Sequence, residues 1–74
     1  MKDQQLAAFG LRLRELRLER GLSQEELGSL AELDRTYISG IERGTRNVGL
    51  INVFRIASAL DVHPSELFAT TKAR

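Results

Sequence analysis

The chain has 74 residues, no cysteine and one histidine, His63, and its net charge is only +1. This length allows one small domain, and the lack of cysteine excludes a disulfide framework and a thiolate metal site. Hydrophobic residues make up 42% of the sequence and charged residues 28%, as in ordinary globular proteins. We therefore expect a cytoplasmic protein held by packing alone, with no cofactor, metal, small-molecule ligand, membrane span or signal peptide.

Glycines and capping residues divide the sequence into five helical segments, and none has the alternating pattern of a strand. The first helix is expected at about residues 3–20, and Gly21 suits its C-terminal end. Ser23 and Glu26 have the spacing of a capping box, which opens a second helix at about residues 24–31. The inward-facing apolar residues should be Phe9, Leu13 and Leu16 in the first helix and Leu27, Leu30 and Ala31 in the second.

Three shorter helices are predicted in the second half of the chain. Asp34 is a favourable N-cap for a helix at about residues 35–43. A fourth helix is expected at about residues 50–60, and Pro64 suits the first position of a short fifth helix at about 64–69. The inward residues of these helices should be Ile38, Ile41, Leu50, Val53, Ile56, Ala57, Leu60, Leu67 and Phe68.

The predicted third helix is polar and basic on its outer side, and a tight turn joins it to the second. Helix-turn-helix DNA-binding proteins have this arrangement, because the major groove, about 12 Å wide, admits one α-helix whose outer face contacts base edges. Arginine can pair with guanine, and threonine can contact thymine. Gly40, with no side chain, would let the backbone approach closely. The residues expected on the outer face are Arg35, Thr36, Tyr37, Ser39, Gly40 and Arg43.

The charge pattern alone leaves two interpretations open. All charged residues between residues 23 and 34 are acidic, whereas those between 35 and 47 are basic except for Glu42. This distribution fits a molecule with one basic and one acidic face, and it also fits an ordinary solvated surface of mixed charge.

Several spaced motifs resemble the Cro/C1-type (XRE-like) helix-turn-helix domain of phage repressors and bacterial regulators. They are GLSQEEL at residues 21–27, IERG at 41–44, RN at 46–47 and ASALDV at 57–62. The segment LDRTYISGIER at 33–43 is most similar to the controller proteins of restriction–modification systems.

The resemblance implies an all-α, compact five-helix domain of the lambda-repressor type. The domain would comprise residues 1–74, with a core at about 9–69 and a helix-turn-helix at about 24–31 and 35–43. Independently of the resemblance, the terminal position of residues 70–74 predicts a frayed tail. Its implied function is sequence-specific binding of double-stranded DNA by a homodimer that regulates transcription at a pseudo-palindromic operator. RNA polymerase is a further candidate partner.

The resemblance also implies roles for individual residues. The implied base-reading residues are Arg35, Thr36, Ser39 and Tyr37; the phosphate-contacting residues are Gln24, Arg43, Arg46 and Asn47; the structural ion pair is Arg17 with Glu42; and the dimer interface contains Ile51, Asn52 and Arg55. For Tyr37, stacking on DNA and packing back on the domain stay equal alternatives. Gly28 replaces the family's usual alanine, which should cost helix stability, up to about 1 kcal/mol.

Two other functional classes compete with DNA binding. An antitoxin-like protein-interaction module with the same fold is the alternative, but it needs an additional apolar surface or tail, and residues 70–74 are short and polar. An enzyme is not expected, because the sequence has no nucleophile with a partnered base, no glycine-rich phosphate loop and no metal-ligand spacing.

Overall fold

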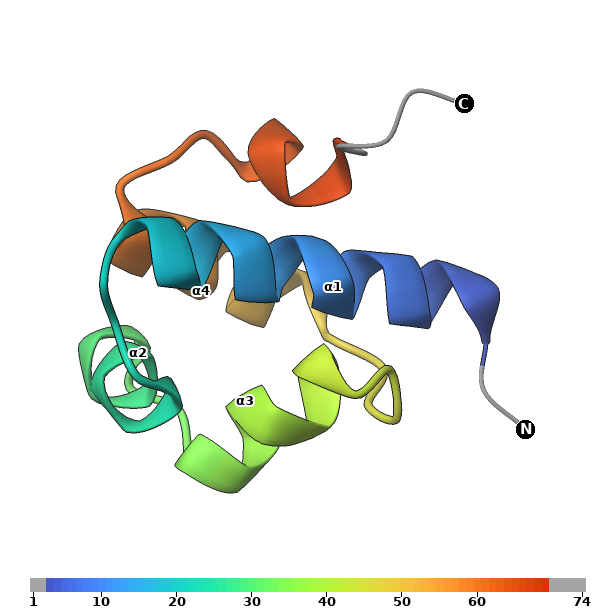
Figure 1. Ribbon diagram of the computed structural model, residues 1–74, viewed down its shortest axis with the longest axis horizontal. Coiled ribbons are helices and arrows are strands. Elements are labelled where there is room, and N and C mark those ends of the chain that lie inside the picture. Colours follow the sequence, from blue (N-terminus) through green and yellow to red (C-terminus); the bar gives the residue numbers. More distant parts are fainter. Residues whose placement is uncertain (1–2, 70–74) are drawn as a thin grey trace.

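A long first helix, α1, forms the centre of the fold. The computed structural model describes residues 3–69, and the other helices pack around α1 (Figure 1): α2 and α3 lie on one side of it, η1 lies on the opposite side, and α4 lies behind it. The elements are α1 (Gln4–Glu19), α2 (Gln24–Ala31), α3 (Arg35–Glu42), α4 (Leu50–Leu60) and the 3-10 helix η1 (Pro64–Phe68).

The predicted all-α class is confirmed, since residues 3–69 contain no strand, but the count of five α-helices is wrong. The last helix, η1, has only five residues and is a 3-10 helix. Its backbone bonds span three residues, as in the 2.9 Å bond from the Glu66 N–H to the His63 carbonyl, and such short helical pieces commonly take the 3-10 form. The tail predicted at residues 70–74 lies outside the described residues.

Side chains just before the helices fix where most of them begin. Asp3 caps α1, Ser23 and Glu26 form the predicted capping box at α2, and Asp34 caps α3. These side chains accept hydrogen bonds from N–H groups that have no partner inside the helix. The N-cap of α4 is Gly49, which supplies no side-chain bond.

The core fills the space enclosed by α1, the other α-helices and η1. Its fully buried large side chains are Leu13, Leu27, Ile38, Ile41, Ile56, Leu60 and Leu67. Three residues predicted to face inward are instead exposed: Leu30 is 60% exposed, Leu50 66% and Phe68 64%. The buried side of α2 is formed by Leu27, Gly28 and Ala31, which turns Leu30 outward. Leu50 begins α4 beyond the core, and the Phe68 ring packs at the surface against Phe9, with centroids 5.2 Å apart.

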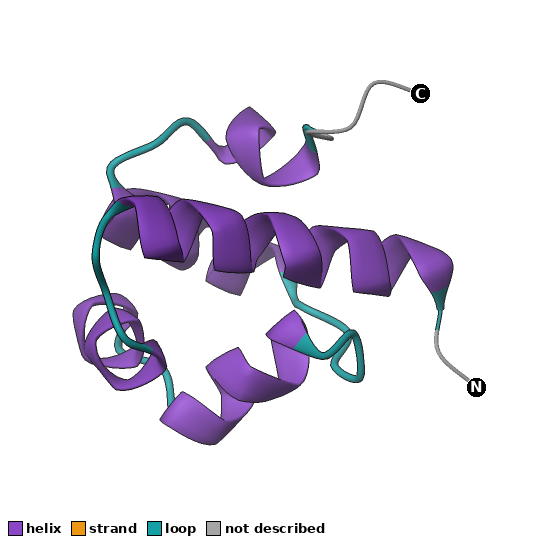
Figure 2. Cartoon of the chain, in the orientation of Figure 1, coloured by secondary structure: helices purple, strands orange, loops and turns teal. Residues whose placement is uncertain are grey.

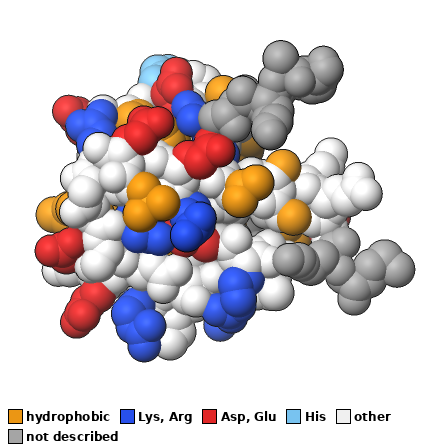
Figure 3. Space-filling view, viewed as in Figure 1, with side chains coloured by type: hydrophobic (Ala, Val, Ile, Leu, Met, Phe, Trp, Pro, Cys, Tyr) orange, Lys and Arg blue, Asp and Glu red, His pale blue; other side chains and the backbone are white. Residues whose placement is uncertain are grey.

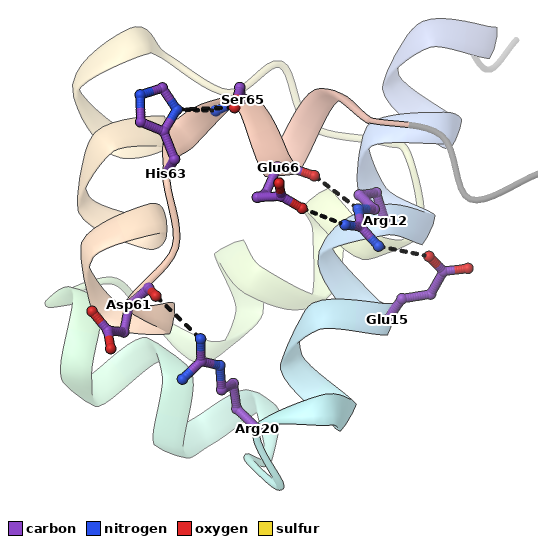
Figure 4. Close-up of polar contacts among 7 residues, drawn as sticks. All are labelled: Arg12, Glu15, Arg20, Asp61, His63, Ser65 and Glu66. Atoms are coloured by element: carbon purple, nitrogen blue, oxygen red, sulfur yellow. Dashed lines mark hydrogen bonds and ion pairs between the residues drawn. The ribbon is translucent and has the colours of Figure 1, made fainter.

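Polar contacts hold η1 and the end of α4 against α1, as Figure 4 shows. The Arg12 guanidinium donates to the Glu66 carbonyl at 2.8 Å and forms an ion pair with the Glu66 carboxylate at 2.9 Å. Arg20 donates to the Asp61 carbonyl at 3.1 Å. These contacts lie on the side of α1 opposite to α3, so they leave the outer face of α3 free.

Two glycines allow close contact at the positions that orient α2 and α3. A Cβ atom on Gly10 of α1 would lie 2.1 Å from the Ile41 carbonyl oxygen, so α1 and α3 cross in backbone contact. A Cβ on Gly28 would lie 2.6 Å from the Leu33 carbonyl oxygen. The prediction that Gly28 only weakens α2 was therefore incomplete, because alanine at this position would push against the turn that leads into α3.

Candidate nucleic-acid interface

The inner and outer sides of α3 differ sharply. Ile38 and Ile41 are fully buried in the core, whereas Arg35, Thr36 and Arg43 are exposed. The turn at residues 32–34 joins α3 to α2, and the two helices form the bent pair visible at the bottom of Figure 2. α3 is thus a short helix supported from behind by α1 and α2, with a polar outer face.

A buried ion pair ties α1 to the C-terminal end of α3. The Arg17 guanidinium donates to the two carboxylate oxygens of Glu42 at 2.6 and 3.0 Å, and to the Leu22 carbonyl at 2.8 Å. The hydrogen bond to Glu42 raises the pKa of Arg17 above its usual value, although burial opposes this shift. The Glu42 side chain is only 4% exposed. Its negative charge is therefore withdrawn from the outer face of α3.

Gln24 joins this network from the first turn of α2. Its side-chain amide donates to a Glu42 carboxylate oxygen at 3.1 Å. α1, α2 and α3 thus meet at one hydrogen-bonded carboxylate, which fixes α3 relative to the rest of the fold. Because an amide nitrogen carries two hydrogens, Gln24 keeps one for an external acceptor.

The N-terminal end of α3 is organised by Asp34. One of its carboxylate oxygens accepts the Thr36 backbone N–H at 2.9 Å and the Thr36 hydroxyl at 2.8 Å. These two bonds lower the pKa of Asp34, with the backbone bond as the larger cause. The Thr36 side chain is thereby held in one orientation beside Arg35, whose guanidinium forms no hydrogen bond or ion pair with residues 3–69.

At the C-terminal end of α3, side chains bond to one another and to the following loop. Arg43 donates a short hydrogen bond to the Ser39 hydroxyl. The Thr45 hydroxyl donates to the Gly40 carbonyl at 3.1 Å, which turns the loop back along α3. Asn47 is exposed on this loop.

Gly40 and Tyr37 do not face outward as predicted. Gly40 is buried, and the aliphatic stem of Arg46 lies over it. Tyr37 is half-buried: its hydroxyl accepts a hydrogen bond from the Asn52 amide at 3.2 Å, and the Arg46 guanidinium carbon lies 5.5 Å from the centre of its ring. These contacts within the domain are compatible with the packing alternative for Tyr37, and its partly exposed ring leaves the stacking alternative a prediction. The prediction that Gly40 offers bare backbone to a ligand is wrong, because Arg46 covers it.

A separate apolar surface runs along α4 and the end of α2. Ile51 is 65% exposed and Phe54 49%, and both line a shallow groove with Leu30. At the edge of this groove, a guanidinium nitrogen of Arg55 lies 3.9 Å from a carboxylate oxygen of Glu32. The Asn52 side chain instead donates its hydrogen bond to the Tyr37 hydroxyl. Phe54 is a further member of this surface that the sequence analysis does not predict, and Leu30, predicted to face inward, is exposed here. The spacing of Phe54 from Ile51, one helical turn, was a signal that could have identified Phe54.

The outer side of α3 carries basic side chains. In Figure 3, arginine side chains project at the lower edge, over α3, and acidic side chains lie beside α2, while arginine and acidic side chains lie together along the top. Arg35, Arg43 and Arg46 are all exposed, on α3 and on the segment that directly follows it, and they carry positive charge there. Among residues 3–69, no group of histidine, aspartate and glutamate could hold a metal ion, and no helix is long and apolar enough to cross a bilayer.

A supported helix with an arginine-rich outer face, joined by a tight turn to the preceding helix, defines a helix-turn-helix protein. The family model described as helix-turn-helix matches residues 13–67. Control protein C.BamHI of Bacillus amyloliquefaciens is 50% identical over 64 residues, which cover 85% of this chain and 79% of that protein. The chain belongs to the helix-turn-helix family, and its close relatives include restriction–modification control proteins.

Solved structures agree with this assignment. The restriction–modification controller protein C.AhdI from Aeromonas hydrophila is 56% identical and has a TM-score of 0.88, over 89% of this chain and 100% of that chain. C.Esp1396I bound to a 19-base-pair DNA duplex is 38% identical and has a TM-score of 0.82, over 89% of this chain and 88% of that chain.

Proposed function

We propose that this protein is a sequence-specific, double-stranded DNA-binding transcription regulator of the restriction–modification controller type, which inserts α3 into the major groove. The observation that carries this proposal is the outer face of α3, where Arg35, Thr36 and Arg43 are exposed while the only acidic residue of the helix is neutralised in the interior. The DNA-bound relative supports it. The protein would act in the cytoplasm, with RNA polymerase as a further partner.

Base reading is assigned to the N-terminal half of α3. Arg35 has a free guanidinium for bidentate pairing with guanine. The bond of the Thr36 hydroxyl to Asp34 leaves the Thr36 methyl group for thymine. Because Ser39 accepts from Arg43, its own hydroxyl hydrogen is available to a base acceptor. Tyr37 completes the predicted base-reading set, but its bond to Asn52 places it at the edge of that face.

Phosphate contacts are assigned to both ends of the helix pair. Gln24 is the first residue of α2 and has one amide hydrogen that is not bonded to Glu42. Arg43 is the C-cap of α3, and Arg46 and Asn47 lie exposed in the loop after it. Arginine and amide donors at these positions would fix the register of α3 on the duplex without reading sequence.

A homodimer would place two reading helices on one face of the DNA, about 34 Å apart. The surface proposed for pairing consists of the predicted Ile51 and Arg55 together with Leu30 and Phe54. Exposed apolar side chains that cluster in this way mark an interaction site. For Asn52, the observed bond to Tyr37 supports a role in the monomer beside its predicted place in the interface.

The two arginine roles are separated by alanine substitution. Arg35→Ala should remove discrimination at one base pair of each half-site, at a cost of about 1–3 kcal/mol, whereas Arg46→Ala should weaken all DNA similarly. Fluorescence anisotropy with a selected duplex, its single-base-pair variants and random DNA measures both effects.

Salt dependence supplies the second measurement for the same variants. Arg46→Ala should reduce the slope of log K against log salt by about 1 per protomer, because one phosphate contact per protomer is lost. A change of sequence preference in Arg46→Ala but not in Arg35→Ala would show that the two roles are assigned wrongly.

A further inference from the structure

Gly40 is covered by the side chain of Arg46. A Cβ atom on Gly40 would lie 2.6 Å from the Arg46 Cγ, 3.4 Å from its Nε and 3.5 Å from its Cδ. The absence of a side chain at position 40 therefore creates the space in which the stem of Arg46 lies against α3.

Hydrogen bonds hold the loop so that Arg46 reaches this space. The Gly40 carbonyl accepts both the Thr45 backbone N–H, at 2.9 Å, and the Thr45 hydroxyl, at 3.1 Å. The residue next along the chain is Arg46, so its backbone begins directly beside the last turn of α3.

The Tyr37 ring lies beside the Arg46 side chain. The Arg46 guanidinium carbon is 5.5 Å from the Tyr37 ring centre, within the range of a cation–π interaction. The Asn52 amide donates to the Tyr37 hydroxyl at 3.2 Å and so links the ring to α4. Two helices thus determine where the Arg46 guanidinium lies: α3, through its backbone at Gly40 and the Tyr37 ring, and α4, which holds that ring through Asn52.

We propose that Gly40, Tyr37 and Asn52 are positioning residues, which seat the Arg46 side chain on α3 before DNA arrives. The inference rests on the proposed function, in which Arg46 contacts a DNA phosphate. An exposed arginine loses rotamer freedom when it binds, and a side chain that is already seated loses less. In this arrangement Gly40 contributes to DNA affinity without touching DNA.

NMR of the DNA-free protein tests whether the Arg46 side chain packs on Gly40 and Tyr37. The Arg46 side-chain protons should show ring-current shifts from Tyr37, and Gly40→Ala should move them toward the values of a free arginine. Asn52→Ala should reduce the same shifts, because the Tyr37 ring loses its link to α4. The matched control is Gly49→Ala, since a Cβ there meets nothing within 4 Å. Unchanged Arg46 resonances in Gly40→Ala would overturn the inference.

A double-mutant cycle tests whether the seat serves DNA binding. Gly40→Ala should weaken DNA binding about three- to tenfold, the range expected for immobilising one flexible side chain. In an Arg46→Ala background, Gly40→Ala should cause no further loss of affinity. Thermal unfolding separates this from a folding defect, because alanine favours a helix over glycine and should not lower the melting temperature once Arg46 is truncated.

The outcomes distinguish the inference from the function on which it rests. Additive losses of affinity in the cycle would overturn the positioning role while leaving the DNA contact of Arg46 intact. Full DNA affinity in Arg46→Ala alone would overturn the phosphate role of Arg46, and the positioning role with it.

Discussion

At the scale of single residues, the placement of Glu42 decides both stability and surface charge. Its carboxylate bonds to Arg17 at 2.6 and 3.0 Å and is almost fully buried. A buried pair of this kind is costly to break from one side only, because the remaining charge has lost its water and its partner.

We predict that Arg17→Met destabilises the fold by about 3–5 kcal/mol, since Glu42 is left buried without its cation. The double variant Arg17→Met/Glu42→Leu should lose much less than the sum of the two single variants. Urea unfolding measures all three. Glu66→Gln is the control, because its pair with Arg12 is more exposed and should contribute less than about 1 kcal/mol. Additive losses in the double variant would contradict the coupling.

Asp34 gives a pH dependence with a defined sign. Its hydrogen bonds to Thr36 lower its pKa in the folded state, so its contribution to stability is present above its usual pKa and is lost as the pH falls through the lowered folded value. Asp34→Asn keeps a cap and removes the titration. We predict that the melting temperature of the wild type minus that of Asp34→Asn decreases as the pH falls below about 4. Thermal unfolding across this range checks the prediction, and a constant difference would contradict it.

At the scale of the elements, the crossing of α1 and α3 depends on backbone contact at Gly10. Alanine normally favours a helix over glycine by up to about 1 kcal/mol. Here the new methyl group would meet the Ile41 carbonyl, and a carbonyl in a helix cannot move aside as a flexible side chain can.

We predict that Gly10→Ala lowers the free energy of unfolding by about 1–3 kcal/mol, despite the better helix propensity of alanine. It should also weaken DNA binding, because α3 is displaced from α1. Urea unfolding and anisotropy measure the two effects. Gly49→Ala adds a methyl group in open space, although alanine caps α4 less well than glycine; a loss in Gly10→Ala no larger than the loss in Gly49→Ala would refute the steric explanation.

The elements could largely be predicted from sequence because their ends are local. Ser23 and Asp34 cap the helices they precede, Glu26 completes the capping box from within α2, and the hydrogen bonds involve residues only two or three positions away. The 3-10 form of η1 could not be distinguished from a short α-helix, because both begin well with proline and their backbone hydrogen bonds differ by only one residue in span, three residues instead of four.

The sequence predicts which residues belong to the candidate DNA-binding surface of α3, but not how all of their side chains pack. Arg35 and Thr36 follow the local cap and are exposed as expected. Gly40 is predicted to be exposed but is buried, because the side chain of Arg46, from the following loop, packs over it. Helical periodicity carries no information about where a loop side chain packs. Leu30 was misplaced because the packing of the short helix α2 is set by its neighbours, which bury Gly28 instead.

At the scale of the whole molecule, DNA binding and self-association are proposed for separate surfaces. The reading face belongs to α3, and the apolar groove of Leu30, Ile51 and Phe54 lies between α2 and α4. A substitution in the groove should therefore act on DNA binding only through the loss of the dimer.

We predict that Phe54→Glu gives a monomer that keeps its helical content and binds DNA weakly and without cooperativity. Sedimentation measures the oligomeric state, and anisotropy measures binding. Leu18→Glu is the control, because Leu18 is 52% exposed on α1, outside this groove. A dimer that persists in Phe54→Glu, or that is lost in Leu18→Glu, would place the interface elsewhere.

The most direct test of the reading role of α3 is selection of binding sites from a pool of random duplexes, carried out with the wild type and with Arg35→Ala. For the wild type we predict a two-fold symmetric consensus with half-sites about 10 base pairs apart, centre to centre. For Arg35→Ala we predict the same consensus with preference lost at one symmetric pair of positions. No enriched sequence, or an identical consensus from both proteins, would contradict the proposal that Arg35 and α3 read the DNA.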